Sequence, residues 1–363
     1  MRRTVAILAI ASLALPLGAQ QPAQAPPQEE EGFRVRVKVE LVTAPLVVRD
    51  GQGEFVYDLQ RGEVTVFDNG VPQQLTNFEL ASEPLSLVIL LDTSQRVAPL
   101  LERVRKSGIL FTSYILGQFG EAAVMTFDTD LNLRQEFTSD PDKIISAVAS
   151  IPAGGNGRRL ADALDWAVNM LLDRPEGRRR VIIAITEPSD DGSRIPVGMP
   201  LRHAQLAEIS VYTISLSGAQ ADMMRRPEET PVPDSPYPPG VFPLPPTPGQ
   251  VQTPTTEANR QYARLDLLSA IAALVSTLQH TRKENVLELY AQGTGGLNYS
   301  SWSRTGFENS INEIGQDLHN QYQISYRPSN RDQEGFHRVE IRVSRPGTSV
   351  RTRPGYYVGP PPG

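Results

Sequence analysis

The stretch that decides the fold of this chain is Leu85-Ser86-Leu87-Val88-Ile89-Leu90-Leu91-Asp92-Thr93-Ser94. Its first seven residues are nearly all apolar, which is typical of a strand buried on both faces in a parallel sheet. Three polar residues follow directly, and Pro99 fits the first turn of a helix that we expect to reach about Leu116. The stretch therefore predicts a central strand whose polar end opens onto one edge of a parallel sheet.

The alternation of strand and helix continues through residues 83–320. Further buried strands are predicted at 122–127, 180–186 and 209–216, with an edge strand at 131–137 and a short strand at 297–300. Helices are predicted at 142–151, 160–172, 201–208, 261–290 and 307–319, several of them marked by apolar residues at helical spacing. Because strands that alternate with helices form βαβ units, we expect an α/β fold. Its sheet should be doubly wound and mostly parallel, with helices on both faces.

The sequence on both sides of this region predicts antiparallel strands. Residues 33–41 alternate apolar and polar positions, Leu46-Val47-Val48 continues the strand pattern, and Asp68-Asn69-Gly70 is a strong hairpin signal. The same alternation returns at 322–326, 339–343 and 356–358. We expect residues 33–82 to form a β unit that pairs with strands from 321–358, which makes one discontinuous accessory β domain.

A proline-rich segment at 226–255 interrupts the α/β rhythm. It carries eleven prolines between Pro227 and Pro254, a composition typical of polyproline II or disorder. We interpret it as an insertion that projects from the surface. A proline-rich ligand for a partner protein is the alternative.

The N-terminus resembles an export signal. Arg2 and Arg3 precede an apolar stretch at 4–17, and Ala19 is a small residue at which the signal could end. Residues 1–19 are therefore predicted to be a signal peptide and residues 20–32, rich in Pro, Gln and Glu, a disordered leader. An uncleaved N-terminal anchor is the alternative. No other stretch approaches the roughly 20 apolar residues of a membrane span, so we expect none after signal removal and a periplasmic or secreted protein.

Composition narrows the function classes further. The 363 residues carry 35 basic and 41 acidic side chains, a net charge of −6, and no long basic stripe that would indicate nucleic-acid binding. The absence of cysteine excludes disulfides and thiolate chemistry. An exported chain without cysteine must be held together by its core alone, which this length allows.

A resemblance to a known family rests on several features in order. The buried strand that ends in Asp92-Thr93-Ser94 resembles the first metal-site motif, D-x-S-x-S, of the von Willebrand factor A domain. The wider chain is similar to the VWFA-related family known mainly from acidobacteria, whose pattern is a signal peptide, a β unit ending in "DNG…F", the A domain and a tail. The matching segments here are Val66-Phe67-Asp68-Asn69-Gly70 with Phe78, Ala291-Gln292-Gly293-Thr294-Gly295-Gly296, Gln321-Tyr322-Gln323-Ile324-Ser325-Tyr326-Arg327-Pro328 and Arg351-Thr352-Arg353-Pro354-Gly355-Tyr356.

The resemblance implies a metal site at the carboxyl ends of the parallel strands, where open α/β sheets bind ligands. In the family, two hydroxyls of the first loop, a threonine of a second loop and two aspartates surround Mg²⁺, and a partner's carboxylate completes the site. This chain keeps Asp92 and Ser94, but Arg96 stands at the second serine. Arg158 stands at the threonine, two residues before Leu160-Ala161-Asp162-Ala163-Leu164, and Glu187 replaces the third-loop aspartate.

Charge argues against a bound ion at these positions. Two guanidinium groups would already supply the positive charge of a metal, and a divalent cation beside them would be repelled and would lack two oxygen ligands. We therefore expect no bound Mg²⁺ or Mn²⁺, and no other cofactor, at this degenerate site. An arginine–carboxylate cluster in place of the ion is one hypothesis. Arginines that point into solvent, with Asp92 and Ser94 as helix caps, are the alternative.

The chain shows no motif of a catalytic site. Its four histidines are widely spaced, and no G-x-S-x-G elbow, P-loop or G-x-G-x-x-G follows a strand. The resemblance implies an exported, non-enzymatic protein-interaction or adhesion-type module with an unknown protein partner. A structural or assembly scaffold of the cell envelope is the alternative, and a metal-dependent hydrolase a third.

Overall fold

The structure is a computed structural model that describes residues 41–216, 285–300, 304–330, 333 and 335–358. The predicted signal peptide at 1–19, the leader at 20–32, the proline-rich insertion at 226–255 and most of the predicted strand at 33–41 lie outside these ranges. So do residues 261–284 of the predicted helix at 261–290. In the part of the chain that is described, no helix is long and apolar enough to cross a membrane.

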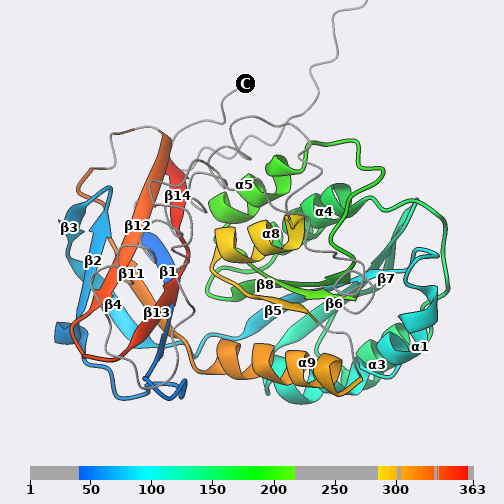
Figure 1. Cartoon of the computed structure of the whole chain (residues 1–363), viewed down its shortest axis with the longest axis horizontal. Coiled ribbons are helices and arrows are strands. Elements are labelled where there is room, and N and C mark those ends of the chain that lie inside the picture. Colours follow the sequence, from blue (N-terminus) through cyan, green and yellow to red (C-terminus); the bar gives the residue numbers. More distant parts are fainter. Residues whose placement is uncertain (1–40, 217–284, 301–303, 331–332, 334, 359–363) are drawn as a thin grey trace, which may run out of the picture. The chain divides into compact units, whose positions relative to one another are not determined.

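A six-stranded sheet forms the centre of the α/β region (Figure 1). Its order is β10-β9-β8-β5-β6-β7, and all neighbours are parallel except β6 and β7. The strands are β5 Leu85–Asp92, β6 Glu121–Phe127, β7 Leu131–Thr138, β8 Arg179–Thr186, β9 Ser210–Ser215 and β10 Asn298–Ser300. The predicted mostly parallel, doubly wound sheet is thereby confirmed, and every residue of β5 is buried.

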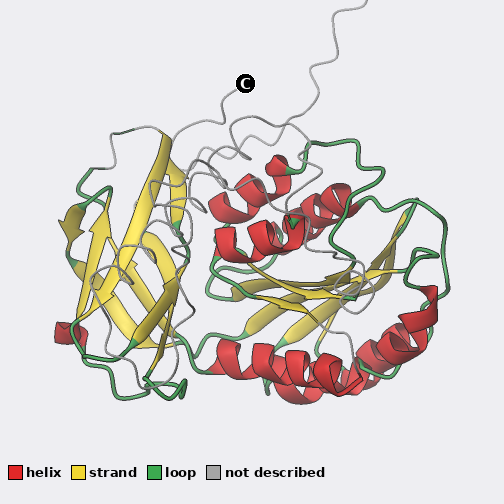
Figure 2. Cartoon of the chain, viewed as in Figure 1, coloured by secondary structure: helices red, strands yellow, loops and turns green. Residues whose placement is uncertain are grey.

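Helices cover both faces of this sheet (Figures 1 and 2). Alternate residues of β5 point to opposite faces, as strand geometry requires. Leu87 and Ile89 pack into one core with η3, α1, α3 and α9, whereas Val88 and Leu90 pack into a second core with α4, α5 and α8. The helices are α1 Leu101–Arg105, α2 Gly108–Leu110, η3 Phe111–Leu116, α3 Pro141–Ala149, α4 Leu160–Leu172, α5 Gly198–Leu206, α8 Val286–Thr294 and α9 Arg304–His319.

The segment after β5 is not the single helix that its sequence predicts. A 3-10 turn, η2 (Ala98–Leu100), leads into α1 and α2, and the segment ends in η3, a π-helix. Two contacts explain the break. The Ser107 hydroxyl donates to the Val104 carbonyl at 2.6 Å, a back-bond of the kind that bends helices. Gly108 lies so close to α3 that a Cβ there would stand 2.9 Å from the Ile145 Cα.

Two antiparallel four-stranded sheets form the accessory β region (Figure 2). One has the order β13-β1-β11-β4 and the other β14-β12-β2-β3, so each combines strands from both ends of the described chain. The apolar faces of both sheets contribute to one core. The elements are β1 Val42–Arg49, η1 Arg61–Glu63, β2 Val64–Asp68, β3 Val71–Gln73, β4 Leu75–Leu80, β11 Tyr322–Tyr326, β12 Gly335–Val343, β13 Ser349–Thr352 and β14 Gly355–Val358.

The hairpin between β2 and β3 follows its sequence signal. Asn69 and Gly70 have φ angles of 48° and 80°, the positive values of a type I′ turn. Asn69 also ties the hairpin to β12, because its side-chain oxygen accepts a hydrogen bond from the Arg338 amide at 2.9 Å.

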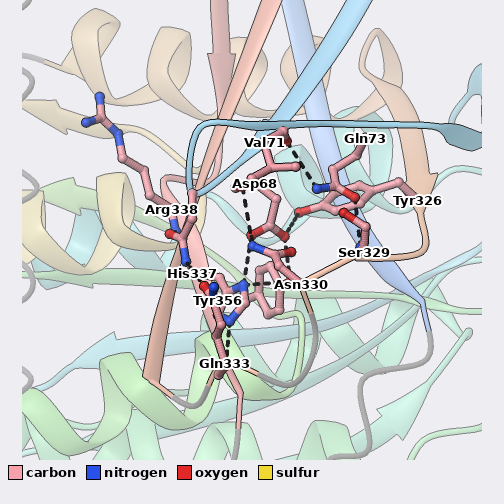
Figure 3. Close-up of polar contacts among 11 residues, drawn as sticks. Asp68, Val71, Gln73, Tyr326, Ser329, Asn330, Gln333, His337, Arg338 and Tyr356 are labelled. Carbon is pink, nitrogen blue, oxygen red and sulfur yellow. Dashed lines mark hydrogen bonds and ion pairs between the residues drawn. The ribbon is translucent and has the colours of Figure 1, made fainter.

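Asp68 is the centre of a buried polar cluster in this region (Figure 3). Its carboxylate accepts from Tyr326 at 3.0 Å, Tyr356 at 2.6 Å and Asn330 at 3.0 Å, and its Oδ1 lies 2.7 Å from His337 Nδ1. The other ring nitrogen of His337 lies 2.7 Å from a backbone carbonyl. Asp68 ends β2, and its partners come from β11, β12, β14 and the loop before β12, so one carboxylate joins both β sheets.

Candidate functional site: the carboxyl ends of β5 and β8

Asp92 is the last residue of β5, at the point where the strand order reverses between β5 and β8. Its carboxylate is buried and both oxygens have protein donors. Oδ1 accepts from the Ser94 amide at 2.8 Å, and Oδ2 accepts from the Thr186 hydroxyl at 2.7 Å. Since Thr186 ends β8, this carboxylate bridges the carboxyl ends of the two central strands, which is where open α/β sheets bind ligands.

The pKa of Asp92 is raised above its ordinary value. Burial is the main cause, because it disfavours the charged carboxylate. Hydrogen bonds from Thr186 and Ser94 and the positive charge of Arg158 oppose the shift without cancelling it.

Arg158 lies in the segment before α4, and its side chain is only 1% exposed. Nη1 donates to the Glu187 carboxylate, and Nη2 donates to Asp191 Oδ2 at 2.5 Å. Burial alone would lower the pKa of this guanidinium, but the two carboxylates and the nearby Asp92 raise it overall. The side chain is therefore held as an internal cation beside Asp92, rather than pointing into solvent.

Arg96 takes a different position. Its side chain is 64% exposed, and Nη1 lies 3.7 Å from Glu187 Oε2. Arg158 is buried with two partners, and Arg96 stands at the rim of the same cluster. The structure thus brings Asp92, Arg158 and Glu187 together and leaves Arg96 accessible.

Ser94 is buried, and neither it nor Asp92 caps the helix that follows. The first helical turn begins at Ala98 with Val97 as its N-cap. The bond from the Ser94 amide to Asp92 instead closes a tight local turn directly after the strand.

The loop after β8 contributes residues that sequence reasoning missed. Asp190 Oδ2 accepts from the Ala161 amide at 3.0 Å and so satisfies a free N–H in the first turn of α4. Asp191 is the second partner of Arg158. A run of acidic residues close behind a buried strand was the available signal, but spacing alone does not reveal which distant cation each carboxylate meets.

A glycine-rich segment between α3 and α4 closes over the site. The Gly154 amide donates to the Thr93 carbonyl at 2.7 Å, and the Gln95 amide donates to the Gly155 carbonyl at 2.9 Å. A Cβ at Gly154 would stand 1.8 Å from Asp128 Oδ2, itself bonded by the Thr93 hydroxyl at 2.8 Å. The loop can therefore approach Asp128 this closely only because Gly154 has no side chain.

The side chains gathered here differ from the oxygen set that the resemblance implies. A guanidinium stands among the carboxylates, and the oxygens of Asp92 already accept from protein donors. Within the described ranges, no three histidine, aspartate or glutamate residues are grouped so that they could hold a metal ion.

Comparisons with known proteins found a matching family model and similar solved structures. Among the solved structures are an aerotolerance-related membrane protein from Bacteroides fragilis with multiple mutations to serines (16% identity, TM-score 0.40, covering 64% of this chain and 98% of that one) and the conserved hypothetical protein BatB from Bacteroides thetaiotaomicron (13%, 0.37, 64% and 99%). The comparison with curated proteins found no match. Residues 87–192 match the model of the von Willebrand factor type A domain, from β5 to the loop after β8. This chain therefore contains a von Willebrand factor type A domain.

Proposed function

We propose that the chain is an exported, non-enzymatic protein-interaction module whose von Willebrand factor type A domain binds its partner without a metal ion. The observation that carries the proposal is the buried Arg158 guanidinium with its two carboxylate partners. Domains of this family commonly mediate protein interactions, which supports the general class of function.

Electrostatics supports the absence of an ion. Mg²⁺ requires oxygen ligands in near-octahedral geometry, and Arg158 offers none. A divalent cation near Asp92 would also be repelled by a guanidinium that is poorly screened because it is buried. We infer that Arg158 binds the Glu187 and Asp191 carboxylates, offsets one of their two negative charges, and so performs the structural part of a metal's role.

Arg96 is the group that we expect to meet the partner. Arg158 already binds two carboxylates, so Arg158 and Arg96 do not hold a partner's carboxylate jointly. Arg96 has one long contact and a largely exposed side chain, and its planar fork suits a carboxylate. We propose an acidic segment of a partner protein as its ligand.

Capture of the partner from an envelope extract tests this proposal. Binding should be unchanged by EDTA, should weaken at high salt, and should fall in Arg96→Glu. Arg134→Glu, the same charge change on the exposed part of β7, is the matched control and should bind normally. Capture that is lost with EDTA and restored by Mg²⁺ would overturn the proposal. Capture that is insensitive to Arg96→Glu but lost on changes in exposed edge strands would favour the scaffold role.

A further inference from the structure

Two adjoining hollows lie at the opposite edge of the six-stranded sheet, where β8 and β9 begin. Their volumes are about 690 Å³ and 260 Å³, and both are lined by Arg180, Gln205, Glu208 and Arg353. The sizes suit a small ligand. Arg180 comes from β8, Gln205 and Glu208 from α5 and the turn behind it, and Arg353 from the link between β13 and β14.

Arg353 is buried but incompletely bonded. It is 3% exposed, and its Nη2 donates to Glu208 Oε1 at 3.1 Å. Its Nε is buried without any hydrogen-bond partner. A buried donor that is left unpaired destabilises the folded protein, so an acceptor that reached this N–H would stabilise it.

Arg180 and Gln205 also each have one buried polar atom without a hydrogen-bond partner. Arg180 donates from Nη2 to a backbone carbonyl at 3.2 Å, but its buried Nε has no partner. Gln205 is 2% exposed and donates from Nε2 to the Gly293 carbonyl at 2.7 Å, while its Oε1 has no partner. Three residues that line both hollows thus each carry a buried polar atom without a partner: two guanidinium donors and one amide acceptor.

The remaining charges limit what can bind. Glu208 offsets one of the two guanidinium charges and is held in place by the Thr43 amide, which donates to its Oε1 at 3.0 Å. Arg179 also lines the larger hollow, but it is bonded to backbone carbonyls at 2.7 Å and 3.3 Å. One net positive charge therefore remains at the shared wall, which favours a monoanion.

We propose that these hollows bind the monoanion of a small phosphate monoester. Its charged oxygens would accept from the Nε groups of Arg180 and Arg353, and its remaining P–OH would donate to Gln205 Oε1. The smaller hollow takes the phosphate and the larger one the organic group. Sulfate has the same shape but no proton to donate, so Gln205 discriminates against it. This site is independent of the one at Asp92.

Calorimetric titration of the full chain with methyl phosphate at pH 5.5 tests the proposal, because the monoanion dominates below the second pKa of about 6. We expect binding by the wild type, at least tenfold weaker binding of sulfate, and at least tenfold weaker binding of methyl phosphate by Arg180→Gln. Arg174→Gln is the matched control, since Arg174 lines neither hollow.

Melting temperatures establish that each variant is folded. Arg353→Lys keeps the positive charge but lacks the guanidinium Nε, so its affinity for methyl phosphate is a second measurement of the same contact. Should Arg353→Lys fail to fold, the partly exposed Arg180 still carries the test. No binding of methyl phosphate by the wild type, equal binding of sulfate, or full binding by folded Arg180→Gln would each overturn the proposal.

Discussion

The buried Arg158 guanidinium donates to Glu187 at the carboxyl end of β8, and the two residues come from loops 29 positions apart in the sequence. In the motif that this chain resembles, position 158 belongs to a threonine. The pair therefore places a fixed protein charge where related sequences carry a hydroxyl, and this substitution can be reversed by mutation.

Replacing Arg158 by threonine should create metal affinity. The change leaves the Glu187 and Asp191 carboxylates without their cation and adds a hydroxyl oxygen, so hard divalent ions gain ligands and lose a repelling charge. We expect calorimetry to detect Mn²⁺ binding in Arg158→Thr and the melting temperature of this variant to rise with added Mn²⁺. Arg159→Thr, next in the chain and paired with Asp162, should show neither effect. An Arg158→Thr variant that is folded and indifferent to Mn²⁺ would contradict the replacement of an ion by Arg158.

Gly154→Ala should destabilise the domain by about 1–3 kcal/mol, because the added methyl group overlaps Asp128 Oδ2 and the loop must move outward. Gly62→Ala is the control, since nothing lies within 4 Å of a Cβ there. Urea denaturation of both variants measures the difference. Equal stabilities would show that the loop does not press on Asp128.

Asp68→Asn should destabilise the accessory β region by about 2–4 kcal/mol. The carboxylate accepts from Tyr326, Tyr356 and Asn330, and its Oδ1 lies against His337 Nδ1. An amide has only one acceptor oxygen, so the substitution leaves several of these buried groups without a partner. Tyr356→Phe removes only one hydrogen bond to the same carboxylate and should cost about 1 kcal/mol. If Asp68→Asn destabilises the protein no more than Tyr356→Phe, Asp68 is one acceptor among several rather than the centre of the cluster.

The raised pKa of Asp92 predicts a pH-dependent stability. Because the folded state holds this proton more tightly than the unfolded chain, the contribution is fully present below the ordinary pKa of 3.8 and is lost as the pH rises through the folded pKa. Asp92→Asn cannot titrate. The free energy of unfolding of Asp92→Asn should therefore rise relative to that of the wild type as the pH increases through this window. Urea denaturation between pH 3 and 7 measures the difference. A difference that is constant with pH, or that changes in the opposite direction, would show that the pKa is not raised.

The central sheet was predictable because its signal is local. The apolar run of β5 fixes a strand buried on both faces, and the polar residues behind it mark the edge where Asp92 lies. The place of Glu187 behind β8 follows by the same reasoning. The break near Gly108 was not predictable, since its cause is a close contact with Ile145 in another helix.

The contacts within the site join residues that lie far apart in the sequence, so local patterns do not reveal them. The sequence shows that Arg158 carries a positive charge, but its burial depends on Asp191 in the loop after β8. The composition of that loop indicates only that it is acidic and polar. The hollows near Arg353 are still less visible from the sequence. They form where α5 and the start of β8 meet segments from the two ends of the described chain, and no single stretch contains that arrangement.

The pairing of β1 with β11 and β13 has a consequence for the order of folding. During synthesis β1 emerges hundreds of residues before its two neighbours, so the accessory sheets cannot close until nearly all of the described chain is available, and contacts this distant in sequence form slowly. The strands of the von Willebrand factor type A domain pair with strands that are closer to them in the sequence, so this domain can fold first. The accessory β region is thus the last part of the described chain that can close.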